Sequence, residues 1–267
     1  MQSSDRVCHP SAVRVGPAPA PRLARVSRQQ PEQQAPPVQR LRIRYAKRGR
    51  LRFTSHRDVS RAIERAVVRA EIPMAYSSGF HPHPRISYAG AAPTGAASES
   101  EYVELGLAAV RDPAEVGAAL DAALPDGLDV VAVVDAATSL EGSLSDLLTA
   151  SRWQIDLGDL AVEVVAPAVQ AFLAAESVTV ERMTKKGLRS FDCRAAVARM
   201  DVVDGSVGAA LDLLLAHTVP AVRPDDVLTG LRETGALATP ATALLTRAAQ
   251  GVLDRDTGTI GDPLEAR

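Results

Sequence analysis

The side chains best suited to acid–base chemistry fall in two short runs, and the first is residues 55–58. Here His56 stands two residues before Asp58. Apolar residues recur with helical spacing from Val59 onward, so a helix is predicted to begin at Ser55. Ser55 followed three residues later by a carboxylate is the start signature of a capping box. His56 would then lie at the positive end of the helix dipole, which favours a neutral imidazole that can act as a base. His56 and Asp58 are therefore candidate catalytic groups; the alternative is that His56 only covers a sheet edge.

The second run is the loop at residues 76–85, which reads YSSGFHPHPR. Its glycine and prolines predict a stiff, irregular segment. Histidines two residues apart point to opposite sides of an extended chain, so one faces a cleft and His83 is the third catalytic candidate. A zinc site would need two further ligands, such as His56 and a carboxylate, and we predict no metal. Backbone N–H groups around Gly79 could hold an anion. The predicted substrate-binding residues of this loop are Tyr76, Ser77, Gly79, Phe80, His81, His83 and Arg85.

Charge is distributed unevenly along the chain. Residues 1–39 carry a net charge of +3, residues 40–85 carry +9, and the remainder carries −14, although the whole chain is at −2. This split favours an anionic partner for the first third of the chain. The alternative is that the basic region is neutralised by the protein's own acidic part.

Arginines supply most of this basic character. Alternation at residues 41–45 predicts a strand with one solvated, basic face, and Arg57, Arg61, Arg65 and Arg69 recur every four residues along the predicted helix. Such a surface is typical of nucleic-acid binding, because arginines bind phosphates and aromatic side chains stack on bases. The predicted phosphate-binding side chains are Arg44, Arg57 and Arg61, and the aromatic side chains are Tyr45, Phe53, Tyr76 and Phe80.

The elements that must position these groups follow the order strand, helix, strand, strand, helix, strand over residues 40–137. This is the order of a ferredoxin-like βαββαβ module. A looser repeat is predicted at 150–232, with a strand at 152–157, a helix at 167–175 and a hairpin at 178–195. A helix at 207–216 and a strand at 219–223 complete it. The predicted fold is thus α+β, with tandem ferredoxin-like modules and antiparallel sheets. A disordered Pro- and Gln-rich tail precedes them at 1–39, and a short helix and a frayed tail follow at 233–267.

Several functions are excluded or disfavoured by the residue types. The chain has two cysteines, Cys8 and Cys193, whereas a radical-SAM iron–sulfur cluster needs three thiolates. We predict no cofactor. Nucleophile-elbow, P-loop and dinucleotide-binding fingerprints are absent from the sequence. Because no apolar run is long enough for a membrane span or a secretion signal, we expect a cytoplasmic protein that does not contact the membrane.

Residues 41–107 resemble the radical-SAM-linked bacterial proteins of unknown function, which carry a DUF2344-type domain, in a stand-alone, actinobacterial-like form. The residues that carry the resemblance are FTSHRD at 53–58, Arg65-Ala66, Arg69-Ala70, Ile72-Pro73, YSSGFHPHPRIS at 76–87, Gly95 and SESEY at 98–102. Residues 150–230 are similar to the second half of that family. The resemblance implies a radical SAM partner protein acting in trans. It carries over no catalytic residue, and Arg57 stands where the family has an apolar residue.

Three hypotheses follow. The first is an accessory protein that binds RNA or another anionic substrate and presents it to a radical SAM enzyme. The second is an independent nuclease- or transferase-like enzyme that uses His56 with His81 or His83 as acid–base groups. The third is a non-catalytic subunit whose basic face docks on an acidic protein.

Overall fold

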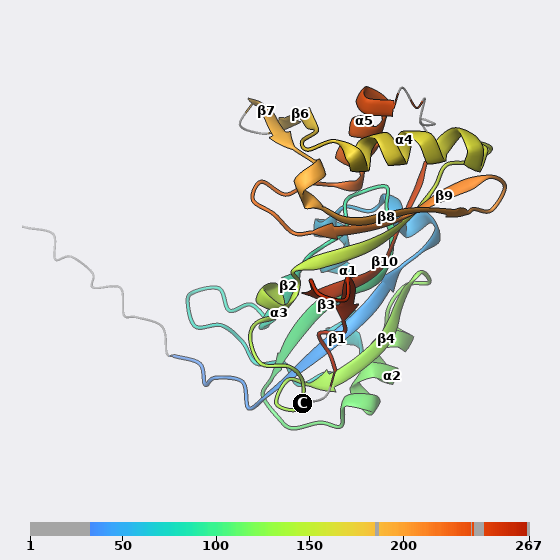
Figure 1. Cartoon of the computed structure of the whole chain (residues 1–267). Coiled ribbons are helices and arrows are strands. Elements are labelled where there is room, and N and C mark those ends of the chain that lie inside the picture. Colours follow the sequence, from blue (N-terminus) through green and yellow to red (C-terminus); the bar gives the residue numbers. More distant parts are fainter. Residues whose placement is uncertain (1–32, 185–186, 236, 238–242, 266–267) are drawn as a thin grey trace, which may run out of the picture.

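The computed structural model describes residues 33–184, 187–235, 237 and 243–265 (Figure 1). The predicted disordered tail at 1–39 falls mostly on residues 1–32, which lie outside the described residues. The first strand begins at Gln39, at the end of that predicted tail.

The first half of the fold follows the predicted element order. It comprises β1 (Gln39–Lys47), η1 (Gly49–Phe53), α1 (His56–Arg69), β2 (Ile86–Ala89), β3 (Ala97–Leu107), α2 (Pro113–Ala123) and β4 (Leu128–Asp135). The strands lie in the order β4-β1-β3, β2 also pairs with β3, and these neighbours are all antiparallel. The strand, helix, strand, strand, helix, strand order predicted for 40–137 is confirmed.

Local signals explain why α1 begins and packs as it does. The Ser55 hydroxyl oxygen accepts a hydrogen bond from the Asp58 backbone N–H at 3.3 Å, which satisfies one of the free donors of the first turn. Val59, Ile63 and Val67 recur on one side and are buried against the sheet. The segment before α1 differs from the prediction: residues 49–53 form a 3-10 turn rather than a turn followed by an extended segment.

The second half contains one insertion. After α3 (Leu144–Leu147) it comprises β5 (Ala150–Asp156), α4 (Val162–Ala174), β6 (Thr179–Thr184), β7 (Gly187–Asp192), η2 (Arg194–Ala196), β8 (Val197–Asp204), β9 (Ala209–Ala216), α5 (Pro224–Gly235), β10 (Leu244–Asp254) and β11 (Thr259–Gly261). The strands lie in the order β10-β5-β9-β8, again antiparallel, and β6 pairs only with β7 in a separate hairpin. If that hairpin is set aside, both halves place their fourth, first, third and second strands side by side.

Three predictions for the second half are wrong. Residues 209–216 form strand β9, between β5 and β8, and not a helix, and residues 219–223 form no strand. Residues 233–267 were predicted to be a short helix and a frayed tail, yet β10 lies in the middle of the sheet. The sequence of β9, AALDLLLA, explains the first error. A strand buried on both faces is a continuous apolar run, which periodicity cannot distinguish from a buried helix.

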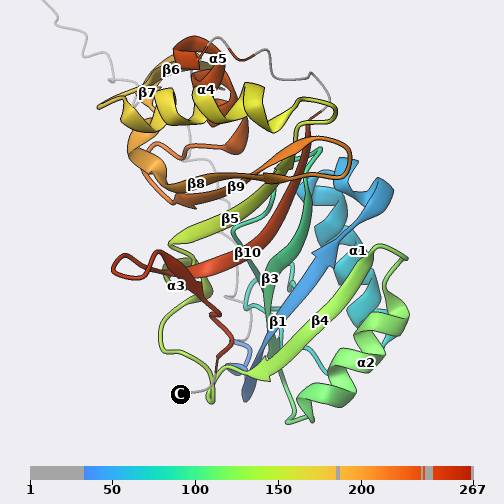
Figure 2. The same cartoon turned by 45° about the vertical axis from the view of Figure 1, so that its right-hand side comes forward.

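The two halves are joined edge to edge. Strand β10 pairs in parallel with the start of β3, through Thr246 opposite Ala97 and Arg247 opposite Ser98, and this pairing makes one sheet of nine strands. Helices α1 and α2 pack beside the first half, whereas α4 and α5 cover the β8–β9 end (Figure 2). None of the described helices is long and apolar enough to cross a bilayer.

Candidate functional site

The exposed side of α1 carries four arginines whose charges are mostly not neutralised by the protein. Arg57, Arg61, Arg65 and Arg69 are all exposed. Within the described residues, Arg61 alone of the four forms an ion pair, with its Nη1 3.9 Å from an oxygen of Asp58. Arg69 donates a hydrogen bond to the backbone oxygen of Ala123 at 2.9 Å. These arginines therefore form an unbalanced cationic ridge, defined here as the α1 ridge.

An exposed aromatic ring lies directly before this ridge in the chain. Phe53, at the end of η1, is 61% exposed, and the guanidinium of Arg52 lies 4.7 Å from its ring centroid. Tyr76 and Phe80 of the loop at 76–85 are also exposed. Tyr45 is not available, because it is 2% exposed and packs under α1. The prediction that Tyr45 stacks on bases is wrong, since its side of β1 faces the helices.

His56 lies at the exposed start of α1, as predicted, but it does not pair with Asp58. Its ring meets Tyr88 edge-on, with the centroids 5.2 Å apart. Asp58 instead accepts a hydrogen bond from the Ser55 hydroxyl at 2.7 Å. Asp58 is thus occupied as a helix cap, and the described contacts give His56 no carboxylate that would orient it as a general base.

The loop at 76–85 is held by its own hydrogen bonds. The Ser77 N–H donates to the His83 backbone oxygen at 2.8 Å, and the His83 N–H donates to Ser77 Oγ at 3.0 Å. The Arg85 Nε donates to the Tyr76 backbone oxygen at 3.1 Å. Gly79 has a φ of 135°, a conformation that favours glycine. The loop therefore presents the side chains of His81 and His83 to solvent.

Within the described residues, no hydrogen bond or ring contact joins His56 to His81 or His83, and the ring that His56 meets is that of Tyr88 in β2. Among the described residues, no group of three His, Cys, Asp or Glu side chains is placed to hold a metal ion.

The basic face predicted for β1 is not solvated, and that prediction is wrong. Arg42 is 4% exposed, and its guanidinium donates to Ser139 Oγ at 2.9 Å and to the Leu140 oxygen at 2.6 Å. Arg44 pairs with Asp262 at 2.7 Å. The segment around residue 140 and the C-terminal segment cover this face, and the protein's own carboxylates and carbonyls accept hydrogen bonds from its arginines.

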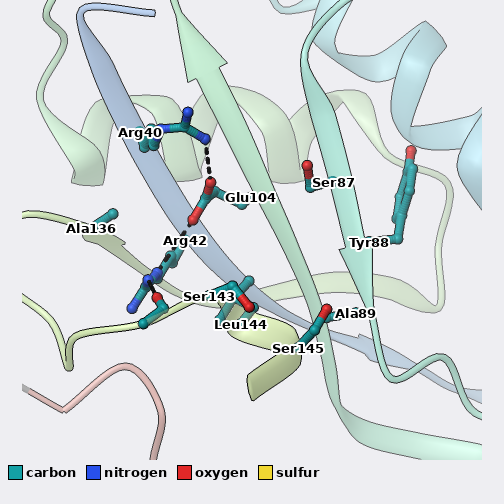
Figure 3. Close-up of a pocket in the computed structure, with 11 residues that line it drawn as sticks. Arg40, Arg42, Ser87, Tyr88, Ala89, Glu104, Ala136, Ser143, Leu144 and Ser145 are labelled. Carbon is teal, nitrogen blue, oxygen red and sulfur yellow. Dashed lines mark hydrogen bonds and ion pairs between the residues drawn. The ribbon is translucent and has the colours of Figure 1, made fainter. Parts of the chain in front are cut away.

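A cavity of about 420 Å³ opens beside this covered face (Figure 3). Glu104 lies between Arg40 and Arg42 on one wall, with its two oxygens 2.8 Å and 3.4 Å from their nitrogens (Figure 3). Ser143 and Ser145 line the cavity beyond Arg42. Glu104 is the one carboxylate that pairs with both arginines, so these three side chains together keep a net charge of +1.

A second cavity, of about 400 Å³, lies at the joint of the two halves and was not predicted from the sequence. It is lined by residues of the segment after β2, of β5, of the segment before α5, and of β10. These residues are Gly90, Ala91, Pro93, Ser151, Trp153, His217, Ala221, Val222, Arg223, Pro224, Arg247 and Gln250. We call it the joint cavity.

A buried ion pair lies at the joint cavity, which its arginine, Arg247, lines. Arg247 and Glu101 are each 3% exposed and form an ion pair through Nη2 of the arginine. The other nitrogens of Arg247 donate to Ser98 Oγ at 3.2 Å, to the Gly90 oxygen at 2.5 Å and to Gln250 Oε1 at 2.6 Å. Arg247 therefore ties β10 to β3 and to the segment after β2.

On the side of the second half, three residues that line the joint cavity are linked by hydrogen bonds: Ser151, Trp153 and His217. His217 Nδ1 lies 2.6 Å from the Leu148 backbone oxygen and must donate to it, so Nε2 accepts from the Ser151 hydroxyl at 3.2 Å. Trp153 Nε1 donates to the same Ser151 oxygen at 2.8 Å. Burial lowers the pKa of His217, and nearby Arg247 lowers it further. The imidazole is thus held neutral in one tautomer.

Burial also perturbs Lys47, beside the ion pair. Lys47 is 3% exposed, and its Nζ donates to the Pro93 backbone oxygen at 3.3 Å. Burial lowers the pKa of Lys47, which the carboxylate of Glu101 partly offsets. The joint therefore concentrates titratable groups away from bulk water.

One sequence signal could have indicated this site. Arg247 and Gln250 interrupt an otherwise mostly apolar run from 244 to 253. Buried polar side chains in such a run require partners, so the run predicts a buried polar network rather than a frayed end.

The fold and these sites define an α/β protein whose large, mostly antiparallel sheet is built from two halves with matching strand order. A family model described as an uncharacterized protein conserved in bacteria (DUF2344) matches residues 40–224, more than half of the chain, so the chain belongs to this family. A comparison with curated proteins found no match.

Proposed function

We propose that this protein is an accessory protein that binds RNA through the α1 ridge and presents it to a radical SAM enzyme. The observation that carries the proposal is the charge left over after the protein's own ion pairs are counted. The arginines of β1 have carboxylate or carbonyl partners, whereas Arg57 and Arg65 of the α1 ridge have no ion pair among the described residues. Unbalanced surface cations attract a polyanion and release its counterions.

The aromatic side chains support a single-stranded ligand. Phe53 precedes the first helical residue of α1 by three positions, and an exposed ring can stack on any unpaired base. The neighbouring guanidinium of Arg52 lies over the same ring and adds positive charge there. RNA loops or ends fit such a surface better than a regular duplex, whose bases are stacked internally.

The radical SAM enzyme enters the proposal through the resemblance and the cysteine content. The chain has two cysteines, fewer than a cluster of that type requires, and Cys193 is buried. The radical chemistry must therefore come from a partner. RNA and such enzymes meet in the cytoplasm, where this proposal places the protein.

We also propose that each half is a ferredoxin-like module, the second carrying the β6–β7 hairpin as an insertion. The fourth-first-third-second strand order of both halves and their antiparallel neighbours support this. Sheets of this kind often serve as nucleic-acid platforms, but here the helix side carries the unbalanced charge.

The test of RNA binding is a titration of a fluorescently labelled single-stranded RNA, followed by anisotropy at several salt concentrations. Replacing Arg57, Arg61 and Arg65 together by Gln should weaken binding. The slope of log K against log salt should fall by about 2, since each lost phosphate contact removes about 0.7.

A matched control has the same change in net charge at a different place. Arg111, Arg189 and Arg255 are exposed and lie outside α1. Their replacement by Gln should leave the salt slope unchanged. Equal losses in both triple variants would mean that overall charge, and not the α1 ridge, binds RNA.

The partner is tested by co-purification from nuclease-treated bacterial lysate, with the recovered proteins identified by mass spectrometry. Recovery of a radical SAM protein by the wild-type chain supports the accessory role. Its absence in treated and untreated lysates would remove that part of the proposal and leave RNA binding standing alone.

A further inference from the structure

We propose that the joint cavity is a binding site for a small organic anion, a carboxylate or a phosphate ester, independent of RNA binding at the α1 ridge. The proposal rests on the cavity's place in the sheet, on a buried donor without an acceptor, and on the charges of the residues that line it.

The cavity exists because two strands share one edge of β3. Strand β2 pairs with residues 102–105 of β3, and β10 pairs with residues 97–98. Residues 99–101 of β3 lie between these two pairings and pair with neither β2 nor β10. A pocket at the junction of two packed units is a common location for small-molecule sites, and about 400 Å³ is within their usual size range.

The unpaired donor is the side-chain amide of Gln250. Its Oε1 accepts a hydrogen bond from Arg247 at 2.6 Å, which fixes the orientation of the amide. Nε2 must then point away from Arg247, and it has no hydrogen-bond partner within the described residues. Gln250 is 2% exposed. Buried donors are almost always satisfied in folded proteins, so this one indicates an acceptor supplied from outside the chain.

Gly90 brings the backbone close to this amide. A Cβ at Gly90 would lie 2.4 Å from Nε2 of Gln250, so no other residue type fits there without moving the amide. Gly90 and Gln250 both line the cavity.

The charge of the lining selects an anion. Among the described residues that line the cavity, Arg223 and Arg247 are charged, and there is no Asp or Glu. Glu101 forms an ion pair with Arg247 and offsets its charge. Arg223 is exposed at the rim, and no ion pair or hydrogen bond of its guanidinium occurs in the described structure. An anionic group near Arg223 could place an oxygen toward Gln250, and Trp153, Val222 and Pro224 would contact an apolar body.

Trp153 makes the site directly observable, because it is the single tryptophan of the chain. The test follows its indole N–H signal in a ¹H–¹⁵N spectrum of the full chain during titration with benzoate, phenyl phosphate, benzamide and inorganic phosphate. Saturable shifts with benzoate alone identify a carboxylate site, and shifts with phenyl phosphate alone identify a phosphate-ester site. Benzamide, the neutral analogue of benzoate, should not compete.

Two variants separate specific binding from general charge. Gln250→Glu keeps an acceptor for Arg247 but removes the amide donor, and it should weaken the binding anion at least about tenfold. Arg223→Gln changes an exposed side chain, so it should weaken the same anion while leaving the fold intact. Arg189→Gln, at an exposed arginine of the β6–β7 hairpin, should leave the affinity unchanged.

Either of two results would overturn the proposal. The first is that none of the four probes produces a saturable shift of the Trp153 signal in the wild-type chain. The second is that Arg223→Gln and Arg189→Gln bind the probes equally well.

Discussion

Removing the charge of Glu101 tests whether the buried ion pair holds the two halves together. The variant Glu101→Gln keeps the shape of the side chain and can still accept the hydrogen bond that Ala92 N–H donates at 3.2 Å. Arg247, 3% exposed, then keeps only neutral partners. Breaking a buried pair in this way costs about 3–5 kcal/mol, because one charge is left uncompensated. Lys47 also loses the carboxylate whose charge favours its protonated form, which adds to the loss.

The assay is urea unfolding followed by circular dichroism, with the change in midpoint converted to free energy at an unchanged slope. The matched control is Asp201→Asn, which breaks the exposed ion pair between Asp201 and Arg199. The side chain of Arg199 is 41% exposed and that of Asp201 is 57% exposed. This control should cost less than about 1 kcal/mol. If Glu101→Gln costs no more than Asp201→Asn, the pair does not stabilise the joint and the reasoning fails.

Three further outcomes are expected. Gly90→Ala should destabilise the fold by at least about 1–2 kcal/mol, because φ is 57° and the added Cβ displaces the Gln250 amide; urea unfolding measures this. Burial lowers the pKa of His217 in the folded chain from its ordinary value of 6.5. The unfolded chain therefore binds more protons at this histidine when the pH falls below about 6.5. Stability should therefore fall as pH drops below about 6.5, and His217→Gln should flatten this slope in unfolding experiments across pH. Burial raises the pKa of Cys193 to about 12, so in a Cys8→Ser background a thiol reagent should react only after denaturation.

The first half could be predicted because its signals are local. Alternation of Leu41, Ile43 and Tyr45 and the Ser55 cap depend on residues close together in the chain. What covers the other face of β1 could not be predicted in this way. Arg42 is buried by contacts with Ser139 and its neighbours, which are 97 or more positions away in the chain. A two-residue period distinguishes the two faces of a strand but does not show which face is exposed to solvent.

The second half was less predictable because Ala and Leu make up nearly all of β9. These residues favour helices by intrinsic propensity, and only the pairing with β5 and β8 makes 209–216 a strand. Arg247 and Gln250 in an apolar run indicate a buried polar network in β10, but the partners of that network could not be predicted, for a related reason. The Arg247–Glu101 pair joins positions 146 residues apart, and such a contact leaves no periodic mark in either segment.

The position of β10 also has a consequence for biosynthesis. A chain leaves the ribosome from its N-terminus, and domains begin to fold as they emerge. The first half can complete its own strands early, but the edge of β3 that β10 covers stays open until β10 has been made. During that interval an unpaired strand edge is exposed to other nascent chains. A stop codon shortly before residue 244 would thus leave β3 and β5 without their shared neighbour, and such a product should aggregate or be degraded rather than persist as a shortened protein.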